Sequence, residues 1–135
     1  MIKFNSEIIS NFVNDNIHFL NNMQVCHWQT KSYSEHEGLG AFYTKFNELN
    51  DRFVETWQGK NNNRILFGAE YKANVANYAD LKDLILRVKV HRDNVSEFAA
   101  YIENINNKAQ LNDVESILED MLEELNQLLY HLSLK

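Results

Sequence analysis

Apolar residues recur at steps of three and four positions in four long segments of this chain, and this periodicity constrains the fold more than any other feature. The segments cover about residues 6–30, 35–59 and 81–105, and from about 113 to the end. Each has the single apolar stripe of an amphipathic helix. The sequence contains no proline and only four glycines, so it lacks the turn residues of an all-β chain. We therefore predict an all-α protein.

Capping residues mark the ends of these segments. Ser6 precedes the first apolar stripe, and Ser34 precedes the second, with Glu37 three positions later as its capping-box partner. Gly59 ends the second stripe, and Asn112 is a suitable N-cap for the last. The caps predict four separate helices with short first and third connections.

The second connection is long, from about residue 60 to residue 80. Its spacing of Tyr71, Val75 and Tyr78 predicts one or two turns of helix within it. A long connection lets the second and third helices of a bundle run parallel, whereas a short one forces them to run antiparallel. We therefore predict a ferritin-like four-helix bundle that forms one domain over residues 1–135.

Composition and charge exclude several classes of function. The formal net charge is −6, and no cluster of Lys and Arg marks either end, so we expect no strong binding of nucleic acid. No apolar run reaches the roughly 20 residues of a membrane-spanning helix. The single cysteine, Cys26, cannot form an internal disulfide, and the first residues lack the apolar core of a signal peptide. These features predict a cytoplasmic protein.

One pair of carboxylates has a spacing that suits a metal ion. Asp51 and Glu55 are four positions apart, which places them on the same face of a helix, where iron, manganese or zinc can share them. They lie about 120° to 160° around the helix from the centre of its apolar stripe. The alternative interpretation is an ordinary solvated acidic face.

The five histidines differ in their positions relative to the apolar stripes. His27 and His36 lie near the adjoining ends of the first two helices, where each is either a metal ligand or a group with a local hydrogen bond. His91 interrupts an apolar stripe, so we expect a core histidine with one polar partner. His18 and His131 have no suitably spaced carboxylate or histidine, and we expect surface groups.

Absent motifs narrow the choice further. Di-iron bundles of the usual type place Glu-x-x-His on two helices, and this sequence has no Glu-x-x-His. The acidic residues of the last two helices lie off the apolar stripes, so we expect no metal centre buried within one subunit. The sequence also lacks a phosphate-binding loop, a dinucleotide fingerprint and a nucleophile motif.

Three short segments together resemble the ferroxidase region of the Dps mini-ferritins. They are Val25-Cys26-His27-Trp28-Gln29-Thr30, Ser34-Glu35-His36 and Asp51-Arg52-Phe53-Val54-Glu55, within a similarity that covers about residues 18–60. The resemblance implies an iron site between two subunits, with His27 and His36 from one and Asp51 and Glu55 from the other. An acidic pair that points away from its own core is what such a twofold interface requires.

The same resemblance implies an activity and an assembly. The expected activity is ferroxidase chemistry, in which peroxide or dioxygen oxidises Fe(II) and the iron is stored or detoxified as ferric oxide. Trp28 is expected beside the site as an electron donor, or as a shield against radicals, or as a packing residue. The expected assembly is a homodimer at least, and a dodecameric cage by analogy with the family. Two histidines and two carboxylates also suit zinc or manganese.

The runs Thr30-Lys31-Ser32-Tyr33 and Trp57-Gln58-Gly59-Lys60 are also similar to an uncharacterised ferritin-like group of phages and large viruses. This second resemblance implies an alternative function: a structural or interaction protein, associated with a virion, whose metal site is vestigial or weakly occupied. The protein would then reside in the host cytoplasm or in the virion.

Overall fold

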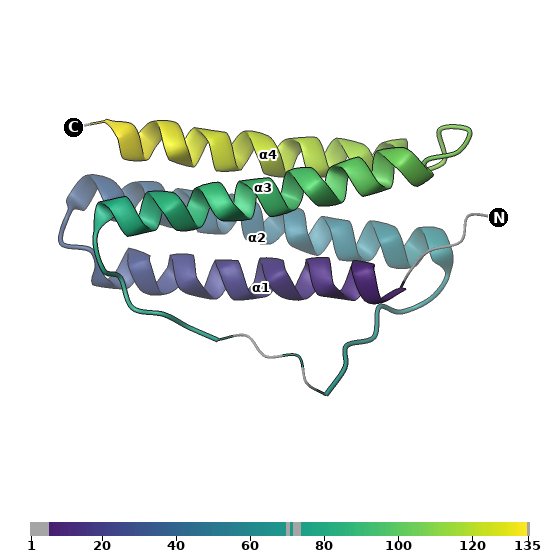
Figure 1. Ribbon diagram of the computed structural model, residues 1–135, viewed down its shortest axis with the longest axis horizontal. Helices are drawn as coiled ribbons and strands as arrows, with labels where there is room; N and C mark the ends of the chain where they lie inside the picture. Colours follow the sequence, from purple (N-terminus) through teal and green to yellow (C-terminus); the bar gives the residue numbers. More distant parts are fainter. Residues whose placement is uncertain (1–5, 70, 72–73, 135) are drawn as a thin grey trace.

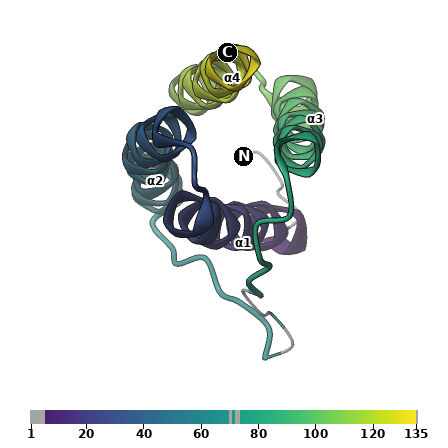
Figure 2. The same cartoon turned by 90° about the vertical axis from the view of Figure 1, so that its left-hand side faces the viewer.

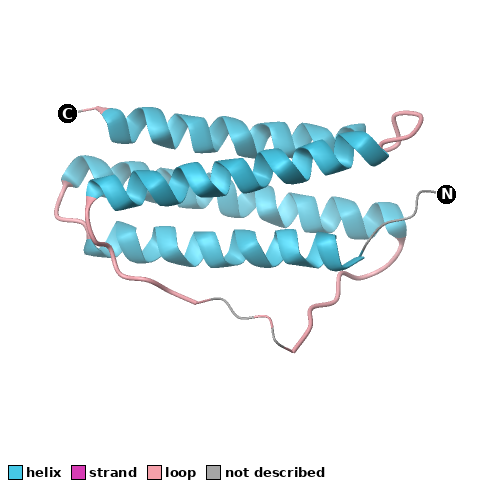
Figure 3. Cartoon of the chain, viewed as in Figure 1, coloured by secondary structure: helices cyan, strands magenta, loops and turns pink. Residues whose placement is uncertain are grey.

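Helices dominate the computed structural model, which describes residues 6–69, 71 and 74–134. They are α1 (Ser6–Gln29), α2 (Tyr33–Asn61), α3 (Leu81–Ile105) and α4 (Asn112–Ser133). This described part of the chain contains no strand, as Figure 3 shows, and the predicted all-α class is confirmed. Within the same residues, no helix combines the length and the apolar character that crossing a membrane requires.

The four helices form a bundle with an up-down-down-up topology (Figure 1). Viewed from the end, α1 lies beside α2, α2 beside α4, and α4 beside α3, while α1 and α3 close the ring with the sparsest contact of the four pairs (Figure 2). Neighbouring helices around the ring run antiparallel. This arrangement confirms the predicted four-helix bundle.

Residues 62–80 connect α2 to α3, and the described part of this crossover (62–69, 71 and 74–80) lies along α1 (Figure 1). Hydrogen bonds attach this crossover to α1: the backbone N–H of Ala76 donates to Asn22 Oδ1 at 2.6 Å, and that of Tyr78 donates to Gln29 Oε1 at 2.7 Å. The prediction of a short helix here was wrong for the residues that are described, while residues 70, 72 and 73 lie outside them. Side chains of α1 accept hydrogen bonds from backbone N–H groups of the crossover. In a helix these groups would instead bond to carbonyl oxygens of the same segment.

Two of the predicted N-caps differ in the structure, and α2 ends at Asn61 rather than at Gly59. Asp80 accepts a hydrogen bond from the backbone of Asp83 at the start of α3. The N-cap of α2 is Ser32 rather than Ser34, so α2 begins two residues earlier than predicted. Asn112 is the first residue of α4 rather than its cap, and Leu111 at the cap position makes no side-chain cap bond.

Aromatic rings fill much of the core. Phe12 of α1 stacks on Phe98 of α3 with ring centroids 3.8 Å apart, and Phe53 of α2 meets both rings edge-on. Burial of each such side chain stabilises the fold by about 1.5–3 kcal/mol. The apolar stripes read from the sequence are therefore the faces that the helices bury.

Candidate metal centre

A three-residue link, residues 30–32, turns the chain from α1 into α2. Glu35 in the first turn of α2 accepts hydrogen bonds from Thr30 Oγ1 at 3.1 Å and from the Tyr78 hydroxyl at 2.8 Å. Burial and the bond to Glu35 raise the pKa of Tyr78. The end of α1, the start of α2 and the crossover are thus tied together at this corner, which fixes the side chains on either side of the link.

The corner brings His27 and His36 into direct contact. Their imidazole rings stack with centroids 3.9 Å apart and planes inclined by 15°. His27 Nδ1 lies 2.7 Å from the backbone oxygen of His36, and His36 Nδ1 lies 2.8 Å from the backbone oxygen of His27. The two residues therefore form a reciprocal pair, in which each ring is oriented by the backbone of the other.

These hydrogen bonds determine the tautomer of both rings. A carbonyl oxygen can only accept, so each Nδ1 carries the proton and each neutral ring keeps its unprotonated nitrogen at Nε2. Metal-binding histidines typically donate the other ring N–H to a carbonyl or carboxylate in this way. Both side chains are partly exposed. The corner presents two oriented imidazoles that are chemically ready to bind a cation.

Gly40 leaves room for the ring of His27 against α2. A Cβ atom at this position would lie 2.8 Å from His27 Cε1, which is closer than real Cβ contacts, and 3.3 Å from His27 Nδ1. A glycine inside a helix ordinarily costs about 1 kcal/mol relative to alanine. Here it lets the imidazole lie against the backbone of α2. The sequence analysis did not identify Gly40, because no motif marks a glycine for close approach.

The structure leaves Asp51 and Glu55 away from the histidine pair. Both carboxylates are exposed on α2, and Asp51 is about 22 Å along that helix from His36 at 1.5 Å per residue. Among the described residues, no three His, Cys, Asp or Glu side chains lie close enough to hold a metal ion together. One chain therefore brings together the two histidines but not the four predicted ligands.

A hollow of about 660 Å³ adjoins Asp51 on the face formed by α1 and α2. Its lining includes Ile17 of α1, Val54 of α2 and Phe67 of the crossover. Ile17 and Phe67 are 36% and 46% exposed, although both are large apolar side chains. The acidic pair thus lies beside apolar surface that its own chain does not cover.

Trp28, the predicted auxiliary residue, is 65% exposed at the end of α1. It does not pack in the core of its own chain, so the packing role considered for it requires another molecule. It directly follows His27 in the sequence and therefore lies at the same corner.

His91 is the core histidine that the sequence predicted. It stacks on Phe19 with centroids 4.0 Å apart, and its Nε2 donates to Asn16 Oδ1 at 2.8 Å. Asn16 Nδ2 in turn donates to Asn50 Oδ1 at 3.0 Å, so a buried polar chain crosses from α3 through α1 to α2. Burial, with a smaller contribution from His18, lowers the pKa of His91 to about 3. The expected polar partner of His91 is confirmed and is Asn16.

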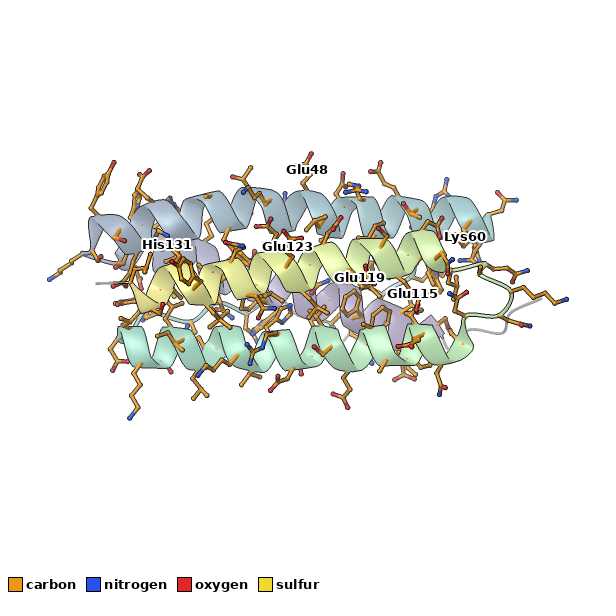
Figure 4. All side chains as sticks on the ribbon, turned by 90° about the horizontal axis from the view of Figure 1, so that it is seen from above. Glu48, Lys60, Glu115, Glu119, Glu123 and His131 are labelled. Atoms are coloured by element: carbon orange, nitrogen blue, oxygen red, sulfur yellow. The ribbon has the colours of Figure 1, made fainter. Side chains whose placement is uncertain are left out.

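His131 is partly exposed, and it makes a contact that the sequence did not predict. Its Nε2 donates to the backbone oxygen of Ser34 at 2.7 Å, and its ring lies against Gly38, where a Cβ atom would collide with it. Figure 4 shows His131 near the end of α4. The residue joins the last turn of α4 to the first turns of α2, a contact between distant parts of the chain that sequence spacing does not reveal.

Negative charge is concentrated on α4. Its sequence has six Asp and Glu residues and no Lys or Arg. Figure 4 shows three of them, Glu115, Glu119 and Glu123, following one another along the helix. At its first turn Asp113 pairs with Lys60 of α2 at 3.3 Å. A helix of this charge repels the phosphate backbone of a nucleic acid.

Comparison with known proteins identifies one family. The model of a family of unknown function, DUF5856, matches residues 27–132, which is well over half of the chain. The match includes the histidine pair and the acidic pair. No curated protein and no solved structure matches the chain.

Proposed function

The chain belongs to DUF5856, a family of unknown function, and we propose that two copies of it form a site that binds Fe(II) and oxidises it. The observation that carries this proposal is the reciprocal pair of His27 and His36, whose Nδ1 atoms are both occupied by backbone oxygens. Two Nε2 lone pairs are thereby oriented for a cation at a partly exposed corner.

The ligand set suits iron. His27 and His36 supply neutral nitrogen donors, and Asp51 and Glu55 of a second copy supply anionic oxygens, which stabilise Fe(III) after the electron is lost. Glu55 offers two oxygens and is the proposed bridge between two iron ions. The same four side chains also suit zinc or manganese, so the test includes identification of the bound metal.

A second copy is required because the acidic pair lies far along α2 from the histidines. If two α2 helices pair antiparallel about a twofold axis near the exposed Thr44, His36 of each copy comes level with Asp51 of the other. The apolar surface around Ile17 and Phe67 then lies in the interface between the two copies, where it is buried. A dodecameric cage built from such dimers is the further expectation.

The proposed reaction uses iron as its substrate. Two Fe(II) ions each give one electron to hydrogen peroxide, which takes up two protons, breaks its O–O bond and leaves as two water molecules. Dioxygen is the alternative oxidant, taking two electrons and two protons to become peroxide. Trp28, which is exposed and follows His27 in the sequence, is the proposed auxiliary electron donor.

A structural role is the second candidate function. Within the described part of one chain only two of the four ligands meet, which also fits an interaction bundle whose metal site is weakly occupied. The distinction rests on whether the assembled protein binds iron and turns it over.

The decisive experiment follows Fe(II) oxidation by peroxide or by dioxygen with the purified protein, alongside metal analysis and light scattering. We expect a dimer or larger assembly and oxidation faster than in buffer. Asp51→Ala and Glu55→Ala should abolish rapid oxidation while helical content is unchanged, because both side chains are exposed.

Glu119→Ala provides the matched control, because it removes one exposed carboxylate from α4, away from the proposed site. It should retain the activity. Oxidation no faster than in buffer, or a monomer at micromolar concentration, would leave the structural alternative in place of the ferroxidase.

A further inference from the structure

A second candidate site lies in the groove between α1 and α3. These two helices have the sparsest contact of the neighbouring pairs (Figure 2), and a groove of about 340 Å³ opens between them. Its apolar lining includes Phe19 and Met23 of α1 and the exposed side chains of Leu86 and Val90 of α3. The volume is within the range of small-molecule sites, about 300–1,000 Å³.

His91 presents an unused acceptor to this groove. Its Nε2 donates to Asn16 Oδ1, so the neutral ring has its lone pair at Nδ1. His91 is 5% exposed, and its Nδ1 has no hydrogen bond to the described part of the chain. Among the described residues, every fully buried side-chain nitrogen or oxygen has a hydrogen-bond partner. The Nδ1 atom is therefore not fully buried, and because His91 lines the groove, Nδ1 can accept a hydrogen bond from a donor bound there.

The charge of the groove determines which donor fits. Asp15, His91 and Asn94 line both this groove and an adjoining hollow of about 210 Å³. Burial raises the pKa of Asp15 and the nearby His18 opposes this, so the carboxylate is incompletely compensated. Two basic residues also line the groove: His18, and Arg87, which is already paired with Asp83 at 2.8 Å. A carboxylate and a neutral acceptor favour a cationic donor.

We propose that the groove binds a small organic ammonium ion that carries an apolar body. The ammonium group donates hydrogen bonds to His91 Nδ1 and to the carboxylate of Asp15, and the apolar body lies against Leu86 and Val90. A bare metal ion fits less well, since these residues form no group of three close ligands. This site is separate from the iron site and does not depend on it.

The probe for this proposal is 2-phenylethylamine, measured by calorimetric titration and by the amide NMR signals of the full chain. We expect saturable binding with a Kd on the order of 1 mM, as its size allows, and shifts of the signals of Leu86 and Val90. Two compounds of the same skeleton serve as comparisons. Uncharged 2-phenylethanol should bind about tenfold more weakly, and anionic 3-phenylpropionate should not bind.

Asp15→Asn should weaken amine binding about tenfold, because it removes the charge but keeps the shape of the side chain. Asp93→Asn is the matched control on α3; its carboxylate is exposed and does not line the groove, so binding should be unchanged. Both substitutions are at exposed positions and should leave the fold intact. Equal binding of the alcohol and the amine, an Asp15→Asn protein that binds normally, or no saturable binding would each overturn the proposal.

Discussion

The histidines of the corner and the histidine of the core are held in opposite ways. His27 and His36 donate from Nδ1 to backbone oxygens and keep Nε2 unprotonated at a partly exposed surface. His91 donates from Nε2 to the side chain of Asn16 and keeps Nδ1 unprotonated on a ring that is largely buried. The first arrangement comes from a local turn between adjacent helices, whereas the second needs side chains from three helices.

This difference separates two kinds of role. A ring held by backbone atoms keeps its orientation when neighbouring side chains change, which suits the metal-binding role proposed for this pair. A ring held by a buried amide contributes to the stability of the bundle. If one residue of this hydrogen-bonded series is lost, its buried neighbours are left without hydrogen-bond partners. Substitutions in the two regions should therefore change different properties.

The largest expected effect is on the acid stability of the core. The pKa of His91 is about 3 in the folded protein against an ordinary value of 6.5, so between these values only the unfolded chain binds the proton. The free energy of unfolding should fall as the pH is lowered from about 6.5 to about 3, by up to about 1.4 kcal/mol per pH unit and on the order of 4 kcal/mol in total. Urea unfolding at several pH values measures this loss.

His91→Phe is the control for that measurement. The new ring keeps the stack on Phe19 but cannot titrate, so its stability should vary less steeply over the same pH range. Identical pH profiles for the two proteins would mean that His91 is not the group responsible.

The second effect concerns the amide that links the three helices. Asn16→Ala leaves the Nε2–H of His91 and Oδ1 of Asn50 buried without partners, and should lower the free energy of unfolding by about 2–4 kcal/mol. Urea unfolding at neutral pH measures it. Asn11→Ala, at an exposed position of the same helix, should change stability by less than about 0.5 kcal/mol. If both variants lose a similar free energy of unfolding, the buried hydrogen bonds of Asn16 have no special role in stability.

The smallest effect distinguishes two glycines of α2. Gly59 has nothing within 4 Å of an added Cβ, so Gly59→Ala should stabilise the helix by up to about 1 kcal/mol. Gly40→Ala should lose most of that gain, because its methyl group displaces the ring of His27. Thermal unfolding measures the difference, and the NMR signal of the His27 Nδ1 proton reports the displaced ring. A gain at Gly40 equal to that at Gly59 would show that the ring is not seated there.

The candidate site was only partly predictable. The spacing of Asp51 and Glu55 correctly places two carboxylates on one exposed helix face, because helical geometry alone fixes which residues share a face. The contact between His27 and His36 depends on the conformation of the three-residue link, which no periodicity encodes. Gly40 and Asn16 gave no signal, since a close approach and a buried amide are defined by the residues opposite them.

The sequence by itself determined the helices and the faces they bury, because a period of about 3.6 residues and the transfer of apolar side chains from water are properties of each segment alone. Tertiary structure decided the rest. It extended the crossover along α1, where Asn22 and Gln29 satisfy backbone groups that a local helix would have paired. It also brought His131 onto Gly38 and His91 onto Asn16. Such contacts join residues far apart in the chain, and their geometry exists only once the helices have packed.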